Sequence, residues 1–262
     1  MTMPTADAAS IKQSQAWRNH FLASMLTANP LPWSDPYKLS RSERTTIEDS
    51  IRQFQLGERS QGRRLLRRGL NYSARVGDPY FARALHLFIK EEQRHSAHLL
   101  RFMEQQRIPA VSKHWVDSIF RRLRGLAGLE LSLRVLVTAE IIAVPYYGAL
   151  GRVTNSPVLG ALSSRILVDE STHLRFQAWM LRRLASDRVA LLANTLAQIH
   201  RLFLIVTACI VWREHRSVFK AAGYNFGRLL KHTLLEYAAL DRASRSLQDI
   251  PILKGFKEVR DA

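Results

Sequence analysis

Cysteine is nearly absent from this chain, which contains a single one, Cys209, among 262 residues. One cysteine excludes disulfide bonds within the chain, and it excludes iron–sulfur and rubredoxin-type centres, which need several thiolates. A redox reaction at this protein would therefore draw its electrons from outside the chain. We expect an external electron donor if the protein is an oxidoreductase.

Long apolar runs and a secretion signal are also missing. The longest largely apolar run, Leu202–Trp212, is shorter than the roughly 20 residues that a membrane-spanning helix needs. The first residues lack the charged segment followed by an apolar segment that marks a signal peptide. We therefore expect a protein that does not cross a membrane and that is cytoplasmic.

Acidic residues are few relative to basic ones. The chain has 22 Asp and Glu against 39 Lys and Arg, which gives a formal net charge of +17. Such a charge attracts anions, although solvated helix faces explain arginine clusters equally well. Since no nucleic-acid motif accompanies the charge, an acidic partner protein or an anionic substrate is favoured over nucleic acid. The clusters are Arg63, Arg64, Arg67 and Arg68; Arg121, Arg122 and Arg124; and Arg182 and Arg183.

Strand-like alternation is rare, so the sequence predicts an all-α protein. Residues 1–39 are expected to form an irregular arm, because Pro30, Pro32 and Pro36 interrupt any helix there. Residues 40–262 are expected to form a single helical domain, with a core bundle over about 40–185 and extra helices over about 186–247. Three aromatic residues of the arm are expected to dock on the bundle: Trp17, Phe21 and Trp33.

Local signals divide the domain into helices. Ser40 and Glu43 form a plausible capping box for the first helix, and Pro145 is expected to kink the third. The second helix is expected over 79 to about 106, followed by a short one over about 115–123, and the fourth over about 157–185. Ser186 would then cap a fifth helix that reaches about 222, and a sixth is expected over 226–247.

A Glu-x-x-His pattern occurs twice, as Glu92-Gln-Arg-His95 and Glu170-Ser-Thr-His173. Residues three apart share one face of a helix, so each pair can direct a carboxylate and an imidazole to one point. A lone glutamate precedes each pair on another helix, Glu58 before the first and Glu140 before the second. Four helices can therefore supply four carboxylates and two imidazoles, the ligand set of a di-iron or di-manganese centre inside a bundle.

Helix geometry supports the second half of this set better than the first. Glu140 lies 15 residues before Asn155 and Glu170 lies 13 after Pro157, so two antiparallel helices bring them to nearly the same height. Glu58 lies 19 residues before Gly77, whereas Glu92 lies 13 after Pro79. This difference predicts a mismatch of roughly 9 Å unless the first helix ends early, near residues 71–73.

The two motifs, Glu91-Glu92-Gln-Arg94-His95 and Asp169-Glu170-Ser-Thr-His173, resemble those of the ferritin-like di-iron carboxylate superfamily. The resemblance covers about residues 40–185, and the superfamily includes monooxygenase hydroxylase subunits, ribonucleotide reductase small subunits and ferritins. It implies a ferritin-like four-helix bundle and two iron ions, with manganese as the alternative. The ligands that it implies are Glu58, Glu92, His95, Glu140, Glu170 and His173.

The resemblance also implies a surrounding network. A metal-bound imidazole needs an acceptor for its second ring N–H. Asp169 is the expected acceptor, and Glu91 and Arg94 are expected to extend the network. No catalytic residue is assigned beyond the metal ligands. Leu99 stands where a radical-storing ribonucleotide reductase subunit would carry a tyrosine, which disfavours that role.

Three functions are compatible with these residues. The favoured one is a di-iron oxidoreductase that activates dioxygen to oxidise a small-molecule or carrier-bound substrate. The second is ferroxidase or peroxide-scavenging activity, and the third is a metal-free, basic helical interaction protein. A substrate-sized apolar pocket beside the metal site would favour the first, and a homo-oligomeric cage would favour the second.

Overall fold

The computed structural model describes residues 6–26, 30–59, 62–126, 128–185 and 190–245. Within these ranges all regular structure is α-helical and no strand occurs, which confirms the all-α prediction. The helices are α1 (Ala8–Leu26), α2 (Arg41–Glu58), α3 (Arg63–Val76), α4 (Pro79–Gln105), α5 (Trp115–Leu126), α6 (Leu129–Leu150), α7 (Pro157–Leu184), α8 (Ala190–Ala221) and α9 (Phe226–Arg245).

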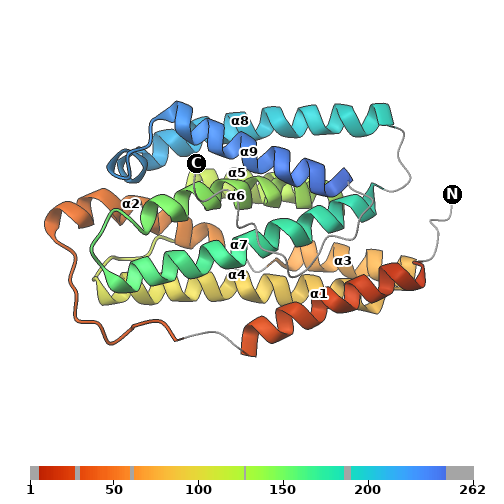
Figure 1. The fold of residues 1–262 in the computed structure, drawn as a ribbon, viewed down its shortest axis with the longest axis horizontal. Helices are drawn as coiled ribbons and strands as arrows, with labels where there is room; N and C mark the ends of the chain where they lie inside the picture. The colour runs from red at the N-terminus through yellow and green to blue at the C-terminus, as the bar shows by residue number, and fades with distance from the viewer. Residues whose placement is uncertain (1–5, 27–29, 60–61, 127, 186–189, 246–262) are drawn as a thin grey trace.

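Most helices run along the length of the molecule (Figure 1). Helix α1 lies along the lower edge of the view and packs against α4, while α8 and α9 form the upper layer. Between them, α4 packs against α2, α3 and α7, and α6 packs against α7, α8 and α9. The four helices that carry the glutamates and histidines singled out in the sequence are therefore neighbours inside one packed unit.

The predicted helix starts are confirmed by their caps. The side chain of Ser40 accepts from the backbone N–H of Glu43, whose carboxylate accepts from the backbone N–H of Ser40, so the capping box is complete. Asp78 caps α4 and Ser156 caps α7, each followed by a proline in the first turn. These caps set where the Glu-x-x-His helices begin, and hence the height of their motifs.

The expectation of an irregular arm over residues 1–39 is wrong for residues 8–26, which form α1. The prolines that suggested irregularity all lie outside this stretch, and the three at 30, 32 and 36 follow the helix. The predicted docking of Trp17 and Phe21 is confirmed, since both side chains are fully buried, and Trp33 packs against the core while partly exposed.

The first bundle helix does not end early at residues 71–73. Instead it is interrupted, so that α2 ends at Glu58 and α3 continues from Arg63 to Val76. Gly62, the N-cap of α3, has a φ of +58°, a left-handed conformation that glycine adopts readily. The interruption lies immediately after Glu58, and it removes the need for one straight helix to match the height of Glu92.

The remaining elements follow the predicted ranges. Helix α6 contains Pro145 and runs as one helix, and α9 is described as far as Arg245. Ser186 and residues 246–247 lie outside the described residues, as does the start of the fifth helix before Ala190. The backbone of α8 departs from helical geometry at His215.

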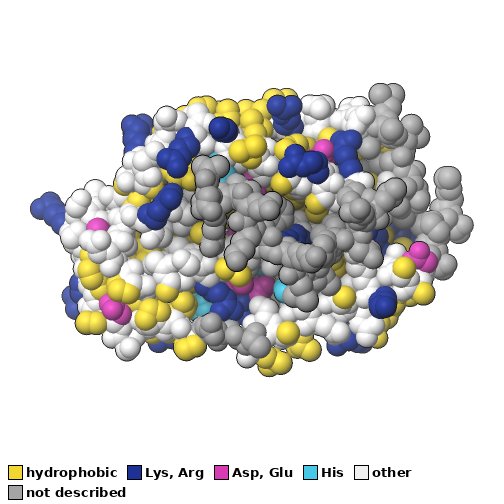
Figure 2. All heavy atoms as spheres, viewed as in Figure 1, with side chains coloured by type: hydrophobic (Ala, Val, Ile, Leu, Met, Phe, Trp, Pro, Cys, Tyr) yellow, Lys and Arg dark blue, Asp and Glu magenta, His cyan; other side chains and the backbone are white. Residues whose placement is uncertain are grey.

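Two helical stretches are long and apolar enough to cross a membrane, by length and composition: Leu129–Leu150 and Asn194–Ala221. In the fold, 78% of the first apolar window is buried, as in the core helix of a soluble protein, but only 33% of the second. Hydrophobic side chains are visible along the upper edge in Figure 2, where α8 lies in Figure 1. Neither stretch decides the expectation of a cytoplasmic protein, which stays a prediction.

The basic side chains do not form a single patch on the face shown in Figure 2, where they are spread among neutral and hydrophobic ones. Arg63, Arg64 and Arg67 of α3 are exposed, and Arg68 donates to Ser132 on α6. Arg63, Arg64 and Arg67 therefore fit a solvated helix face, whereas Arg68 contacts α6, and an acidic partner for this cluster stays a prediction.

The docking of α1 generates a stability prediction. Trp17 is fully buried, and its ring lies against Phe21, Phe176 and Trp179. Replacing a buried tryptophan with alanine leaves a large cavity, so we expect Trp17→Ala to lower the free energy of unfolding by about 3–5 kcal/mol. Urea denaturation followed by circular dichroism measures it. Trp115→Ala, at a side chain 48% exposed, is the control. Equal losses for the two variants would mean that α1 does not contribute to the cooperative fold.

Candidate metal centre

Six acidic and imidazole side chains from four helices meet in the interior. They fall into two groups that share Glu92, and within each group the ligand atoms all lie within 4.8 Å of one another. Helix α2 supplies Glu58 with its last residue, α4 and α7 supply a Glu-x-x-His pair each, and α6 supplies Glu140. The groups are Glu92, Glu140, Glu170 and His173, and Glu58, Glu92 and His95.

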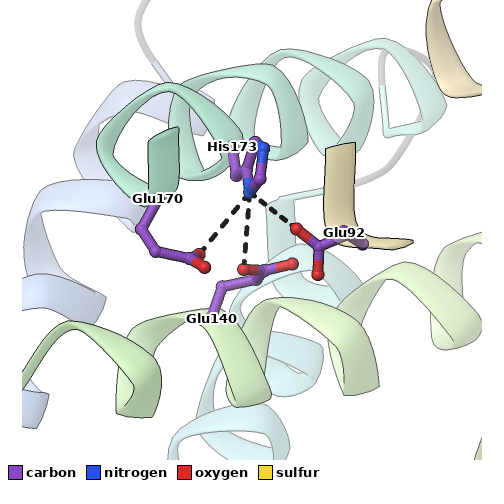
Figure 3. Close-up of side chains that lie close together, drawn as sticks. All are labelled: Glu92, Glu140, Glu170 and His173. Carbon is purple, nitrogen blue, oxygen red and sulfur yellow. Dashed lines mark ion pairs between the residues drawn. The ribbon is translucent and has the colours of Figure 1, made fainter. Parts of the chain in front are cut away.

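His173 is the centre of the first group (Figure 3). Its Nδ1 lies 2.9 Å from Glu92 Oε1, 3.6 Å from Glu170 Oε2 and 3.8 Å from Glu140 Oε2. The three carboxylates come from three helices and all point toward the imidazole. His173 and Glu170 are fully buried, and Glu140 is 3% exposed. Water therefore has little access to this group except from the side of Glu92, which is partly exposed.

His95 is the centre of the second group. Its Nδ1 lies 3.8 Å from Glu92 Oε1 and 3.8 Å from Glu170 Oε1. Glu58 completes this group. Glu92 and Glu170 thus each lie close to both imidazoles, whereas Glu58 belongs to the side of His95 and Glu140 to the side of His173. The pattern predicted from the sequence, two half-sites, closes into one centre with two shared carboxylates.

The outer nitrogen of each imidazole contacts an acidic residue of the other motif. His95 Nε2 lies 3.0 Å from Asp169 Oδ2, and His173 Nε2 lies 3.0 Å from Glu91 Oε2. Because an ionised carboxylate only accepts hydrogen bonds, each imidazole donates from Nε2, and this leaves Nδ1 to face the centre. Asp169 has the contact expected of it. Glu91 has the equivalent contact to His173, which is more than the supporting role expected from the sequence.

Arg94 contacts both Glu91 and Asp169, the two carboxylates on the outer side of the imidazoles. Its Nη2 lies 2.5 Å from Glu91 Oε1 and 3.3 Å from Asp169 Oδ2. Ser24 of α1 donates a further hydrogen bond of 2.5 Å to Glu91 Oε1. The helix that was not predicted therefore helps to hold the network around the centre.

Several buried polar atoms of the centre make no hydrogen bond, although two of them, His173 Nδ1 and Glu92 Oε1, lie 2.9 Å apart as an ion pair. They are Nδ1 of both imidazoles, Oε1 of Glu92 and both carboxylate oxygens of Glu170. Buried polar atoms are normally paired, because leaving one unpaired costs about 1–3 kcal/mol. Five such atoms converging on one interior point are compatible with a bound metal ion, which would give each of them a partner.

The close approach of carboxylates also changes their protonation. Burial, together with the charges of Glu140 and other neighbouring carboxylates, raises the pKa of Glu92 and Glu170 well above the usual range. Burial alone would lower the pKa of His173, but Glu92 and its neighbours outweigh it and raise that pKa. For Glu91 burial would raise the pKa, but the hydrogen bonds from His173 and Ser24 and the charges of His173 and Arg94 together outweigh it and lower that pKa. Without a metal ion, protons are thus held more readily by Glu92, Glu170 and His173 than by Glu91.

Glu58 and Glu140, the two carboxylates that each lie near only one imidazole, are held by Tyr147 and Gln177. Neither Tyr147 nor Gln177 was predicted as a site residue. Tyr147 donates from its hydroxyl to Glu58 Oε1 over 2.7 Å, and burial raises the pKa of Tyr147 so that it stays protonated. Gln177 donates to Glu140 Oε1 over 3.0 Å. Spacing offered a signal for both, since Tyr147 lies seven residues after Glu140 and Gln177 four after His173.

A cavity of about 170 Å³ opens beside the centre. Glu58, Glu92 and Glu140 form one side of it. The other walls are mostly apolar and come from α2, α3, α4, α5, α6 and α8. The centre is therefore asymmetric: the network of Glu91, Arg94 and Asp169 is outside this cavity, and three carboxylates face it.

The outer network generates a metal-affinity prediction. Asp169→Asn keeps the size of the side chain but replaces the carboxylate that accepts from His95. We expect metal affinity to fall by roughly 10- to 100-fold, with a smaller change in stability. Competition with a chelator measures the affinity. Asp241→Asn on α9, outside the centre, is the control. An Asp169→Asn variant with wild-type affinity would exclude this role.

The protonation pattern generates a pH prediction. Raised pKa values of Glu92, Glu170 and His173 mean that the folded, metal-free protein keeps protons that the unfolded chain releases. Stability from these groups is therefore present at low pH and is lost as pH rises past the unfolded values of about 4.5 for Glu and 6.5 for His. We expect the melting temperature of metal-stripped protein to fall between about pH 6.5 and pH 8.

Calorimetry over this pH range gives the measurement, and the double variant Glu92→Gln/Glu170→Gln should flatten the dependence. The lowered pKa values of Glu91, Asp169 and Glu140 act only below about 4.5. Burial lowers the pKa of His200 to about 4 and of His215 to about 3, so these groups oppose the trend only below about pH 6.5. A melting temperature that rises over the window in the metal-stripped wild type, and equally in the double variant, would contradict the assignment.

Comparison with protein-family models, with curated proteins and with solved structures gave no match to this chain. The chemistry of the centre is therefore inferred from its own residues. They form a buried cluster of glutamates and histidines, within metal-binding distance of one another, in an all-helical protein.

Proposed function

We propose that this protein is a ferritin-like di-iron oxidoreductase that uses dioxygen and external electrons to oxidise a small organic substrate. The observation that carries the proposal is the doubled arrangement of the centre. Two imidazoles face two shared carboxylates, and the outer nitrogen of each imidazole contacts an acidic residue of the opposite motif. The residues that would hold the ions are Glu58, Glu92, His95, Glu140, Glu170 and His173.

The charge of the centre supports two divalent ions. Four ionised carboxylates carry four negative charges, and two neutral imidazoles carry none, so two ions of charge +2 bring the sum to zero. Without such ions, four carboxylates buried together are costly unless they take up protons. Oxygen and nitrogen ligands without thiolates suit iron and manganese. We propose iron, with manganese as the alternative, because the carboxylate and imidazole set is that of di-iron bundle proteins.

Each residue around the ligands has a positioning role. Asp169 and Glu91 fix the two imidazoles in one tautomer, with Nδ1 turned inward. Tyr147 donates to one oxygen of Glu58, and Gln177 donates to one oxygen of Glu140. Each hydrogen bond orients the other oxygen of that carboxylate toward the centre. Iron bound there supplies the redox chemistry with dioxygen. The single cysteine provides no internal electron relay, so electrons come from a separate donor.

The cavity beside Glu58, Glu92 and Glu140 favours an organic substrate over iron or peroxide as the substrate. A ferroxidase needs a route for hydrated ions, and mostly apolar walls are poorly suited to one. Mostly apolar walls are suited to excluding water from a reacting organic group. Ferroxidase or peroxide-scavenging activity is therefore the second candidate, and a metal-free interaction protein the third.

The proposal is tested through Glu140, which is buried and belongs to the centre. Glu140→Ala should lose most of the bound iron and the dioxygen uptake that wild type shows with a chemical reductant. Iron per chain is measured by elemental analysis, and dioxygen uptake with an electrode. Glu104→Ala, at an exposed position on α4, is the control and should keep both. Iron-loaded wild type that consumes no dioxygen, or iron content unchanged in Glu140→Ala, would contradict the proposal.

A further inference from the structure

The cavity beside the centre adjoins a second one. The inner cavity, of about 170 Å³, and an outer cavity, of about 550 Å³, share Gln53 of α2 and His114, which immediately precedes α5. The inner cavity faces Glu58, Glu92 and Glu140, and the outer one does not. A molecule that occupies both would pass Gln53 and His114 and place one end beside the centre.

The inner cavity is built for a small apolar group. Its volume is close to that of an engineered apolar cavity of ~150 Å³ that binds benzene. Two of its wall residues carry little or no side chain, Gly57 and Ala139, and each lies next to a glutamate of the centre, Glu58 and Glu140. A side chain added at Gly57 would meet nothing within 4 Å of its Cβ. Both residues are exposed, so the space next to the carboxylates is open and solvent reaches the cavity at this point.

The outer cavity has the opposite character. Four cationic side chains and two carboxylates line it, so its net charge is +2 without any contribution from His114. The two carboxylates neutralise the cations only in part. Glu214 lies 3.6 Å from His114 and so faces that imidazole, while Asp49, whose side chain is 90% exposed, contacts Arg52. The cations are Arg52, Lys113, Arg213 and Arg216.

Two buried polar atoms at this cavity make no hydrogen bond. They are Oε1 of Gln53 and Nε of Arg52. Arg52 contacts Asp49 only through Nη1, and within the described residues Lys113, Arg213 and Arg216 have no ion pair and are exposed. An unpaired buried donor from an arginine, beside three free cations, is what an anionic group would satisfy.

We infer that the substrate of the proposed reaction is a small amphiphile with an apolar end and an anionic end. The apolar end, the size of a benzene ring or a short alkyl chain, occupies the inner cavity. The anionic end, a carboxylate or a phosphate, binds in the outer cavity through Arg52, Lys113, Arg213 and Arg216. This assignment rests on the proposed function for the reaction itself, but the binding site does not depend on the metal.

The test is binding of three probes that share a six-carbon chain: hexanoate, hexyl phosphate and 1-hexanol. Isothermal titration calorimetry should show both anions binding about 10-fold or more tightly than the alcohol, with the difference shrinking as salt is added. The double variant Arg213→Gln/Arg216→Gln should lose about 10-fold in affinity for the anions and none for the alcohol. Arg242→Gln, at an exposed position on α9, is the matched control. Preference for one anion identifies the head group.

A second variant tests the inner cavity. Gly57→Leu should weaken all three probes because its side chain enters the space of the apolar end. Gly57→Ala should stay folded and should gain stability, since alanine favours a helix more than glycine does. Equal binding of the anions and the alcohol, or anion binding that the double arginine variant does not change, would overturn the inference.

The titrations, combined with measurements of iron content and dioxygen uptake, separate this inference from the proposed function. Iron content should be at the wild-type level in the double arginine variant, because none of the outer cations belongs to the centre. Protein that holds iron but does not discriminate anions would overturn only the substrate class. Protein that binds the anions as described but holds no iron and consumes no dioxygen would overturn only the proposed reaction.

Discussion

The burial of four carboxylates and two imidazoles at one interior point is the constraint on which the rest of the structure depends. Like charges so close together, with little water, cannot all be ionised unless positive charge or protons compensate. The surrounding residues reduce part of this cost. Glu91, Asp169 and Arg94 tie the outer faces of the imidazoles, while Tyr147 and Gln177 each hold one carboxylate oxygen. The atoms that they leave unpaired are Nδ1 of both imidazoles and oxygens of Glu92 and Glu170, and these atoms surround the site proposed for the metal ions.

The two sides of the centre are specialised by the helices that cover them. On one side, α1 supplies Ser24 to the network, and Phe21 of α1 and Phe88 of α4 pack against the ring of His173. On the other side, the interruption between α2 and α3 and the small residues Gly57 and Ala139 leave a cavity. The contacts on the α1 side position the imidazoles, and the cavity on the other side gives a molecule access to the carboxylates. Both sides are built around the same four helices, with α1 covering one side and α3, α5 and α8 completing the walls of the other.

Much of this could be predicted from the sequence because the signals are local. Caps at Ser40, Asp78 and Ser156 fix where helices begin, and the three-residue spacing fixes which side chains share a face. Together with the ligand set of di-iron bundle proteins, these signals predicted that six residues meet, although helical rise placed Glu58 roughly 9 Å from the height of Glu92. The fold of residues 8–26 was missed because prolines that follow a helix were read as interrupting it. The partner of Glu91 and both cavities depend on packing between distant segments, which no local pattern specifies.

The central claim is that the six residues hold two iron ions. The most direct measurement is a crystal structure of the iron-loaded protein with diffraction data collected at the iron absorption edge. The account predicts two anomalous peaks inside the bundle, one at Nδ1 of His95 with Glu58 and the other at Nδ1 of His173 with Glu140, with Glu92 and Glu170 between them. A map without peaks at these side chains, or with iron bound only at the surface, would contradict it.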